Sequence, residues 1–254
     1  MSWSSAFGGA EEVRDVYSAQ PEFSAYGLSH WAVIALFVVG SVFLIFAGRR
    51  QTEVQARHLS RVLGGILAVI YGSAVLYSLS SPTLGGSVPL QLTDLATVSA
   101  IYALWSHRHW PFALTYYWGL VLSTQALISP ALAGPDFPGY EFLVFWAIHL
   151  FVVWAAIYLT WGRRMRPTWR SYRLAVLVTL TWAIVTFIFN RVADTNYGFL
   201  NAKPSTASLL DLMGPWPVYL FSGMTIVFVI WALMTWPWER DGSLDKDAAD
   251  QPMG

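Results

Sequence analysis

The chain contains no cysteine among its 254 residues. Disulfide bonds, thiolate nucleophiles and cysteine-ligated metals are therefore excluded. Charged residues are scarce as well, because Asp, Glu, Lys and Arg make up only 12% of the sequence, about half the share found in soluble globular domains. The formal net charge is zero, so the sequence gives no reason to expect a nucleic acid or another polyanion as a partner.

Apolar and aromatic residues take the place of the missing charge. Hydrophobic residues make up 56% of the chain, which holds 14 Trp, 12 Tyr and 15 Phe. Amphipathic rings concentrate where helices cross the membrane–water interface. The composition therefore predicts an integral protein that crosses the membrane many times, with membrane lipids as its natural partners.

Seven apolar stretches have about the length that a spanning helix needs, roughly 20 residues for a hydrocarbon core of about 30 Å. The sequence thus predicts an all-α bundle with an N-terminal segment 1–26, a membrane domain 27–238 and a disordered polar tail 239–254. The predicted spans are Gly27–Gly48, Leu59–Leu79, Pro89–Trp105, Trp110–Ser129, Tyr140–Trp161, Tyr172–Phe189 and Trp216–Trp236.

The basic residues predict the orientation of the bundle. Most Lys and Arg residues lie in the first, third and fifth connections, including the Arg-rich segment Arg163–Arg173. Short loops rich in Lys and Arg remain in the cytoplasm. We therefore expect a multi-pass protein of the cell membrane with its N-terminus outside and its C-terminus in the cytoplasm.

Polar side chains gather in the half of the bundle that this orientation places outside. Such side chains are costly in a membrane and usually face the bundle interior or a cavity. We expect a pocket that opens to the outer leaflet, with Thr93, Gln125 and His149 in its wall. The candidate site residues are Gln91, Thr93, Asp94, Gln125, His149, Asn190, Arg191, Asn196, Tyr197 and Lys203.

Each candidate within the spans also has a structural interpretation. His149 could hydrogen-bond a neighbouring helix, and Gln125 could join two helices in the same way. Thr93 could bond a carbonyl of its own helix. Asp94 could cap the start of the third span by accepting bonds from free amide groups.

The residues near the ends of the spans have structural interpretations too. His30 and the cluster His107–His109 lie near the predicted interfaces, where we expect them to be solvated. Arg191 and Lys203 could each pair with a nearby aspartate. The five histidines are scattered, with no carboxylate at metal-ligand spacing, so we expect neither a metal site nor another cofactor.

Several motifs resemble the YwaF-like family, bacterial membrane proteins related to animal transmembrane protein 164. The resemblance covers nearly the whole chain, and its most specific part lies between the sixth and seventh spans. It implies a membrane protein with this helix order. The motifs are Pro89–Asp94, Gln125–Pro130, Asn196–Leu200 with Lys203–Pro204, and Gly214–Pro217.

The resemblance also implies a reactive pair. The animal relative is regarded as a lipid acyltransferase with a Cys near the start of the third helix and a His in a later one. These residues correspond to Thr93 and His149 here, so Thr replaces the Cys, and Leu150 follows the His where the family tends to have Gly. The similar androgen-induced hydrolases of branched fatty-acid esters are understood to use a Thr nucleophile with a His.

Two functions remain open at the level of sequence. The first is acyl transfer or hydrolysis of a lipid ester, in which His149 activates Thr93 as general base. Gln91, Gln125 or Asn190 would then stabilise the oxyanion, while Arg191 and Lys203 would bind a head group. The second is a lipid or small-molecule carrier, or a subunit of an envelope complex, without chemistry. The enzyme requires Thr93 Oγ1 and a nitrogen of His149 within hydrogen-bond reach or one water apart, whereas the carrier predicts a continuous cavity without that contact.

Overall fold

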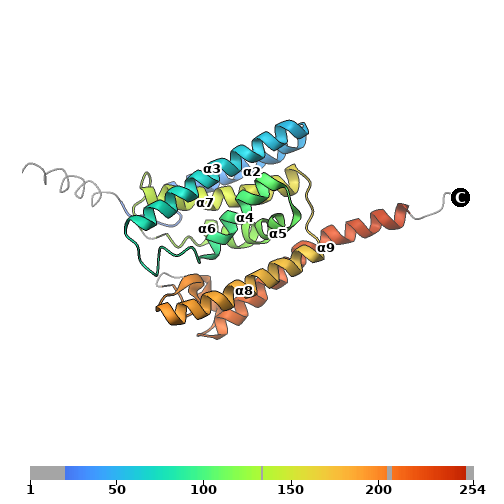
Figure 1. Ribbon diagram of the computed structural model, residues 1–254. Helices are drawn as coiled ribbons and strands as arrows, with labels where there is room; N and C mark the ends of the chain where they lie inside the picture. Colours follow the sequence, from blue (N-terminus) through green and yellow to red (C-terminus); the bar gives the residue numbers. More distant parts are fainter. Residues whose placement is uncertain (1–20, 133, 205–207, 250–254) are drawn as a thin grey trace, which may run out of the picture.

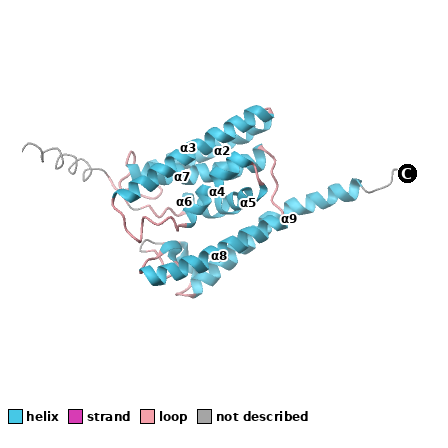
Figure 2. Ribbon diagram, viewed as in Figure 1, coloured by secondary structure: helices cyan, strands magenta, loops and turns pink. Residues whose placement is uncertain are grey.

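The computed structural model describes residues 21–132, 134–204 and 208–249, and these residues form an all-α fold (Figures 1 and 2). The predicted segment 1–26 lies mostly outside the described residues. Seven helical segments follow one another. They are α2 (Leu28–Arg50), α3 (Glu53–Ser80), α4 (Leu92–Ser106), the run of α5 (His109–Tyr117), η2 (Trp118–Ser123) and α6 (Thr124–Ile128), α7 (Tyr140–Ile157) with η3 (Tyr158–Gly162), α8 (Trp169–Ala193) and α9 (Val218–Ala249).

Five of these described segments are long and apolar enough to cross a membrane. They are α2, α3, α7 with η3, α8 and the first part of α9 up to Arg240, with mean hydropathy from 1.9 to 2.5. The 15 residues of α4 fall short of that length. The run from α5 to α6 is interrupted by the π-helical turn η2. Each predicted span coincides with a helical segment, while the side of the membrane that each end faces stays a prediction.

Two helices extend beyond the predicted spans. The first residue of α3 is Glu53, because Thr52 caps the helix: the Thr52 amide donates to Gln55 Oε1 over 3.0 Å, and the Gln55 amide donates to Thr52 Oγ1 over 3.4 Å. At the other end of the chain, α9 continues through Pro237 to Ala249. It thus covers much of the segment that we expect to be a disordered tail, and the domain boundaries stay a prediction.

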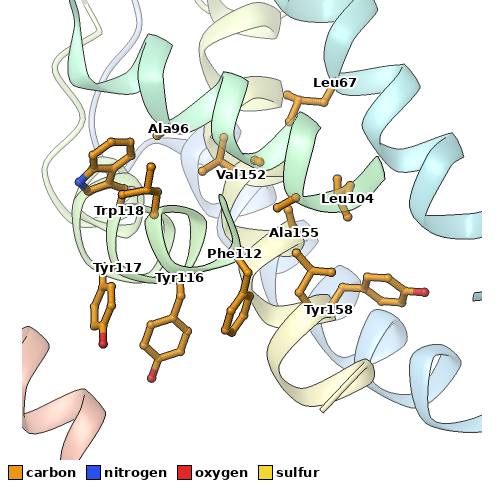
Figure 3. Packing of buried hydrophobic residues seen from close by; sticks show 14 of the residues in the cluster. Leu67, Ala96, Leu104, Phe112, Tyr116, Tyr117, Trp118, Val152, Ala155 and Tyr158 are labelled. Carbon is orange, nitrogen blue, oxygen red and sulfur yellow. The ribbon is translucent and has the colours of Figure 1, made fainter. Parts of the chain in front are cut away.

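The central helix of the bundle is α7. In its most apolar stretch 61% of the residues are buried, against 11 to 22% in the other four candidate spans. It contacts α2, α3, α4, α5 and η2. Figure 3 shows Ala96 and Leu104 of α4 beside Val152 and Ala155 of α7, all within one buried cluster. Small residues such as Ala96 and Ala155 allow two helices to approach closely.

A second layer, formed by α8 and α9, packs along one side of the bundle (Figure 1). Side-chain hydrogen bonds of Tyr116, Tyr117 and Trp118 connect it to α5 and η2. Trp118 Nε1 donates to Thr179 Oγ1 over 2.9 Å, and the hydroxyls of Tyr117 and Thr235 lie 2.6 Å apart. Hydrogen bonds are part of what holds helices together in lipid, where apolar contact alone gives little preference over the lipid tails.

Candidate functional site

Thr93 is the second residue of α4, and its neighbours fix the start of that helix. The Gln91 amide donates to Asp94 Oδ2 over 2.9 Å, so Asp94 acts as the expected cap. The Thr93 carbonyl accepts a hydrogen bond from Thr97 Oγ1 over 2.7 Å. Because residues four and seven positions apart share a helix face, Thr93 lies on the same face as the buried residues Thr97 and Ala100.

Asp94 faces a different helix from Thr93. Consecutive residues are turned about 100° from each other in an α-helix. The Asp94 carboxyl group interacts with the Tyr71 hydroxyl of α3. Asp94 therefore stabilises the α3–α4 contact and is not placed to orient His149, which lies on α7.

The ring of His149 has a defined hydrogen-bonding arrangement. Its Nδ1 lies 2.7 Å from the carbonyl oxygen of Phe145, one turn earlier on α7. A carbonyl oxygen can only accept, so Nδ1 carries the proton in the neutral ring and Nε2 keeps its lone pair. Within the part of the chain that the structure describes, no hydrogen bond reaches Nε2. This is the tautomer that a general base acting through Nε2 requires.

His149 is partly exposed, as are Phe145, Ala147 and Phe151 on the same stretch of α7. Ile148, Leu150, Val152 and Val153 are buried, whereas His149 retains partial exposure in the middle of the central helix. Side chains of this chain therefore do not cover the whole ring, although His149 lines neither of the two hollows described below. Another group can thus approach the exposed part of the ring.

Helix periodicity indicates the direction in which the ring points. One strip of α7, represented by Trp146 and Leu150, belongs to the cluster that includes Leu127 of α6. Another strip, represented by Ile148 and Val152, belongs to the main core with α4 and α5. At 100° per residue His149 lies between these strips, so it is directed towards η2 and α6.

The η2 turn lies close against α7. A Cβ added to Gly119 would lie 3.1 Å from both the Val152 carbonyl oxygen and Ala156 Cβ. The π-helical turn also lets Thr124 Oγ1 donate to the Gly119 carbonyl over 3.2 Å. Gln125 follows on α6, partly buried, and no side-chain hydrogen bond is found for it within the described chain. Single π-helical turns of this kind are frequent at functional sites.

Thr93 and His149 lie on neighbouring helices at different depths. The starts of α4 and α7 both lie beside one region of α3, where Asp94 meets Tyr71 and the Tyr140 hydroxyl donates to Ser73 Oγ over 3.2 Å. His149 follows nine residues after Tyr140, about 14 Å along the axis. No hydrogen bond joins Thr93 Oγ1 to His149 among the described residues, and the catalytic pairing stays a prediction.

Asn190 and Tyr197 organise the loop after α8. Asn190 Oδ1 accepts from the Tyr197 amide over 2.9 Å, and Asn190 Nδ2 donates to the Tyr197 carbonyl over 2.9 Å. The Tyr197 hydroxyl donates to the Leu84 carbonyl over 2.8 Å. Gln91 Oε1 accepts from the Gly198 amide over 3.3 Å. These bonds tie the loop to the start of α4, which favours a structural role for all three side chains.

Of the remaining loop candidates, Asn196 and Lys203 have polar partners and Arg191 has no ion-pair partner among the described residues. Asn196 Oδ1 accepts from the amides of Asn201 and Ala202 over 3.0 and 3.1 Å. Lys203 Nζ lies 3.7 Å from Asp211 Oδ1, as the structural interpretation expects. Arg191 is exposed and makes no ion pair with any described residue. Arg191 is therefore the better candidate of the two cations for a head group.

His30 corrects one expectation from the sequence. It is fully buried, not solvated. Its Nδ1 accepts from the Tyr26 amide over 2.9 Å, Nε2 lies 3.1 Å from the Leu127 carbonyl, and the ring stacks on Trp146 at 5.1 Å. The chain before α2 and the end of α6 close over it. No local signal indicates this, because Leu127 is 97 residues away.

The fold and its apolar spans define an integral membrane protein that crosses the bilayer several times. A model of the TMEM164 family matches residues 25–235, and the chain belongs to this family. The match confirms the resemblance indicated by the motifs. Comparisons with curated proteins and with solved structures gave no match. In the described ranges, no group of three His, Asp or Glu side chains is arranged to hold a metal ion.

Proposed function

We propose that this TMEM164-family protein is an intramembrane enzyme that transfers or hydrolyses the acyl group of a lipid ester. Thr93 is the nucleophile and His149 the general base. The observation that supports this most is the state of the His149 ring, whose Nδ1–H is held by the Phe145 carbonyl while Nε2 of the partly exposed ring has no hydrogen-bond partner among the described residues. A Thr hydroxyl requires such a base, because it is a weak nucleophile at neutral pH.

The proposed reaction has two balanced steps. His149 Nε2 takes the proton of Thr93 Oγ1 as the oxygen attacks the ester carbonyl, and the protonated ring then gives that proton to the departing alcohol. An acyl-threonine results. Water or a second alcohol then attacks it with His149 again as base, which releases the acid or a new ester and restores the hydroxyl.

Gln125 is the best available donor to the oxyanion in this scheme. Its side chain has no hydrogen bond within the described chain, and α6 lies on the side towards which His149 is directed. Asn190 and Gln91 are engaged in the loop after α8. A preorganised amide donor in a site without water stabilises developing charge far better than one in water.

The proposal requires Thr93 and His149 to approach each other. Catalytic hydrogen bonds are often long without substrate and shorten when the reacting complex forms. Because the two residues lie at different depths, the outer ends of α4 and α7 would have to shift when a lipid enters to bring the side chains together. With the N-terminus outside, the lipid would come from the outer leaflet of the cell membrane, and Arg191 would bind its head group.

A fluorophosphonate probe on the purified protein in detergent tests this assignment. Wild type and Thr93→Ser should be labelled, Thr93→Ala should not, and His149→Asn should react at least tenfold more slowly. Thr225→Ala and His109→Ala are matched controls, because both side chains are exposed and far from the pair along the chain. Labelling that survives both Thr93→Ala and His149→Asn would rule out the proposed nucleophile and base.

A carrier without chemistry is the competing function, and one observation favours it. A hollow of about 400 Å³ lies between α4 and α8, with walls that are almost entirely apolar. It could hold an acyl chain, although neither Thr93 nor His149 is among the residues that line it. The carrier predicts that a lipid co-purifies with the protein, that probe labelling is independent of Thr93, and that Trp182→Ala weakens lipid retention. The lining residues are Leu90, Leu95, Leu177, Val178, Thr181, Trp182, Val185 and Thr186.

A further inference from the structure

A second hollow lies at the opposite end of α4 from Thr93. Its volume is about 180 Å³ and its walls are mostly polar. The 15 residues of α4 separate it from the candidate active site, a distance of about 22 Å along the axis. Its lining residues come from α3 and from the end of α4, namely Arg57, Arg61, Leu104, Trp105, Ser106 and His107.

The hollow is built by two contacts between these helices. His107 ends α4 in a left-handed conformation with φ of 50°, and its Nε2 lies 2.8 Å from Ser60 Oγ. One turn further along α3, a Cβ on Gly64 would lie 2.6 Å from the Trp105 indole. The ring thus packs directly across the glycine. Ser60 and Gly64 hold the end of α4 on α3, with Arg57 and Arg61 beside the contact.

At this end of the bundle no carboxylate of the described residues lies within ion-pair distance of the two arginines, although Glu53 interacts electrostatically with Arg57. Both Glu53 carboxylate oxygens lie 2.7 Å from Arg163 Nη2, so Arg163 neutralises the acid nearest to the hollow. Neither Arg57 nor Arg61 forms an ion pair within the described ranges. Burial, together with the nearby guanidinium groups of Arg163 and Arg57, lowers the pKa of His107, which is therefore neutral at physiological pH.

We propose that this hollow binds a phosphate group, carried either by a lipid head group or by a soluble phosphate ester. Two guanidinium groups can each offer two parallel N–H donors to phosphate oxygens. They project from adjacent turns of one helix, so they approach a single anion from the same side. The exposed Trp105 indole provides an apolar border on which the glycerol part of a lipid can rest. The proposal does not depend on the function of Thr93.

Native mass spectrometry of the detergent-purified protein tests this proposal with two lipids that share their acyl chains. Dioleoyl phosphatidic acid carries the phosphate and dioleoylglycerol lacks it. We expect the phosphatidic acid to bind and the double substitution R57Q/R61Q to weaken binding about tenfold. The pair R170Q/R173Q is the matched control, because these arginines are also exposed, lie one turn apart on α8 and remove the same charge.

Both arms of the experiment have decisive outcomes. Loss confined to R57Q/R61Q, with an unchanged melting temperature in the absence of lipid, supports the site. Equal loss in both double variants, unchanged binding in R57Q/R61Q, or equal binding of dioleoylglycerol would overturn it. Competition by millimolar glycerol 3-phosphate that depends on Arg57 and Arg61 would identify a soluble ester as sufficient. Binding of phosphatidic acid that depends on Arg57 and Arg61 but is not displaced by glycerol 3-phosphate would identify a lipid head group as the ligand.

Discussion

Two histidines inside the bundle carry their ring proton on different nitrogens. The His30 ring accepts at Nδ1 from the Tyr26 amide and donates from Nε2 to the Leu127 carbonyl, so both nitrogens are used. The His149 ring donates from Nδ1 to the Phe145 carbonyl and leaves Nε2 free. Their tautomers are therefore reversed, because the partner of Nδ1 is a donor in one case and an acceptor in the other.

The comparison shows that depth alone does not identify a functional histidine. His30 is the less exposed of the two, with 0% exposure, and it stacks on Trp146 of α7. His149 lies three residues after Trp146 and remains partly exposed. A ring with both nitrogens paired stabilises packing, whereas a partly exposed ring with a free lone pair can act as a base. The first role should appear in stability and the second in reactivity.

The largest expected effect on stability is that of His30→Ala. The substitution removes a fully buried ring, leaves the Leu127 carbonyl and the Tyr26 amide without partners, and costs about 3 kcal/mol. His149→Ala loses one hydrogen bond of a partly exposed ring and costs about 1 kcal/mol. Thermal unfolding in detergent measures both. A larger loss of thermal stability for His149→Ala than for His30→Ala would contradict the assignment of the structural role to His30.

His149→Asn should separate reactivity from stability. The Asn amide can replace Nδ1–H as a donor to the Phe145 carbonyl, so we expect the melting temperature to stay near that of the wild type. No base remains in place of Nε2, and loss of a general base typically slows a reaction about 100-fold or more. The rate of fluorophosphonate labelling and a melting curve test this on one sample. Parallel loss of both quantities would assign His149 a structural role instead.

Gly119→Ala tests the close contact beside His149. The added Cβ meets the Val152 carbonyl and Ala156 at 3.1 Å, and relief of such overlap costs about 1 to 3 kcal/mol. Gly65→Ala is the matched control, because a Cβ there meets nothing within 4 Å. The control should be neutral or stabilising, since Ala favours helix over Gly by about 1 kcal/mol. Equal melting temperatures for the two variants would argue against tight packing of η2 on α7.

The smallest effect is expected for Tyr117→Phe in the contact with α9. It removes the hydrogen bond to Thr235 while the ring keeps its packing, and bonds between membrane helices are worth about 0.6 kcal/mol on average. Labelling of Thr93 should not change, because this contact belongs to the second layer. A labelling defect in Tyr117→Phe would show that the layer formed by α8 and α9 controls the site.

The helices and the family were predictable from sequence because both depend on local patterns. Apolar stretches located each helical segment, and the motifs near Thr93 and Tyr197 indicated the TMEM164 relationship. The start of α3 was harder, because its cap Thr52 lies in a polar segment that hydropathy assigns to a loop. The layer of α8 and α9 and its contacts with Trp118 depend on tertiary packing that no local pattern records.

The surroundings of the candidate residues were predictable only in part for the same reason. The sequence located Thr93 and His149 in the third and fifth spans, and their helices are neighbours. The hydrogen-bond partner of His30 lies 97 residues away, so its burial could not be inferred from local pattern. Likewise, the polar character of Asn190 gave no indication that its side chain binds the backbone of Tyr197.

The most direct test of the contrast between the two histidines is their tautomeric state. Protein labelled with ¹⁵N-histidine can be studied by long-range ¹H–¹⁵N NMR in detergent at pH 7.5, with assignments from His30→Gln and His149→Asn. The account predicts a proton on Nε2 of His30 and on Nδ1 of His149. A proton on Nε2 of His149 would contradict it, because that ring would have no free lone pair at Nε2 to activate Thr93.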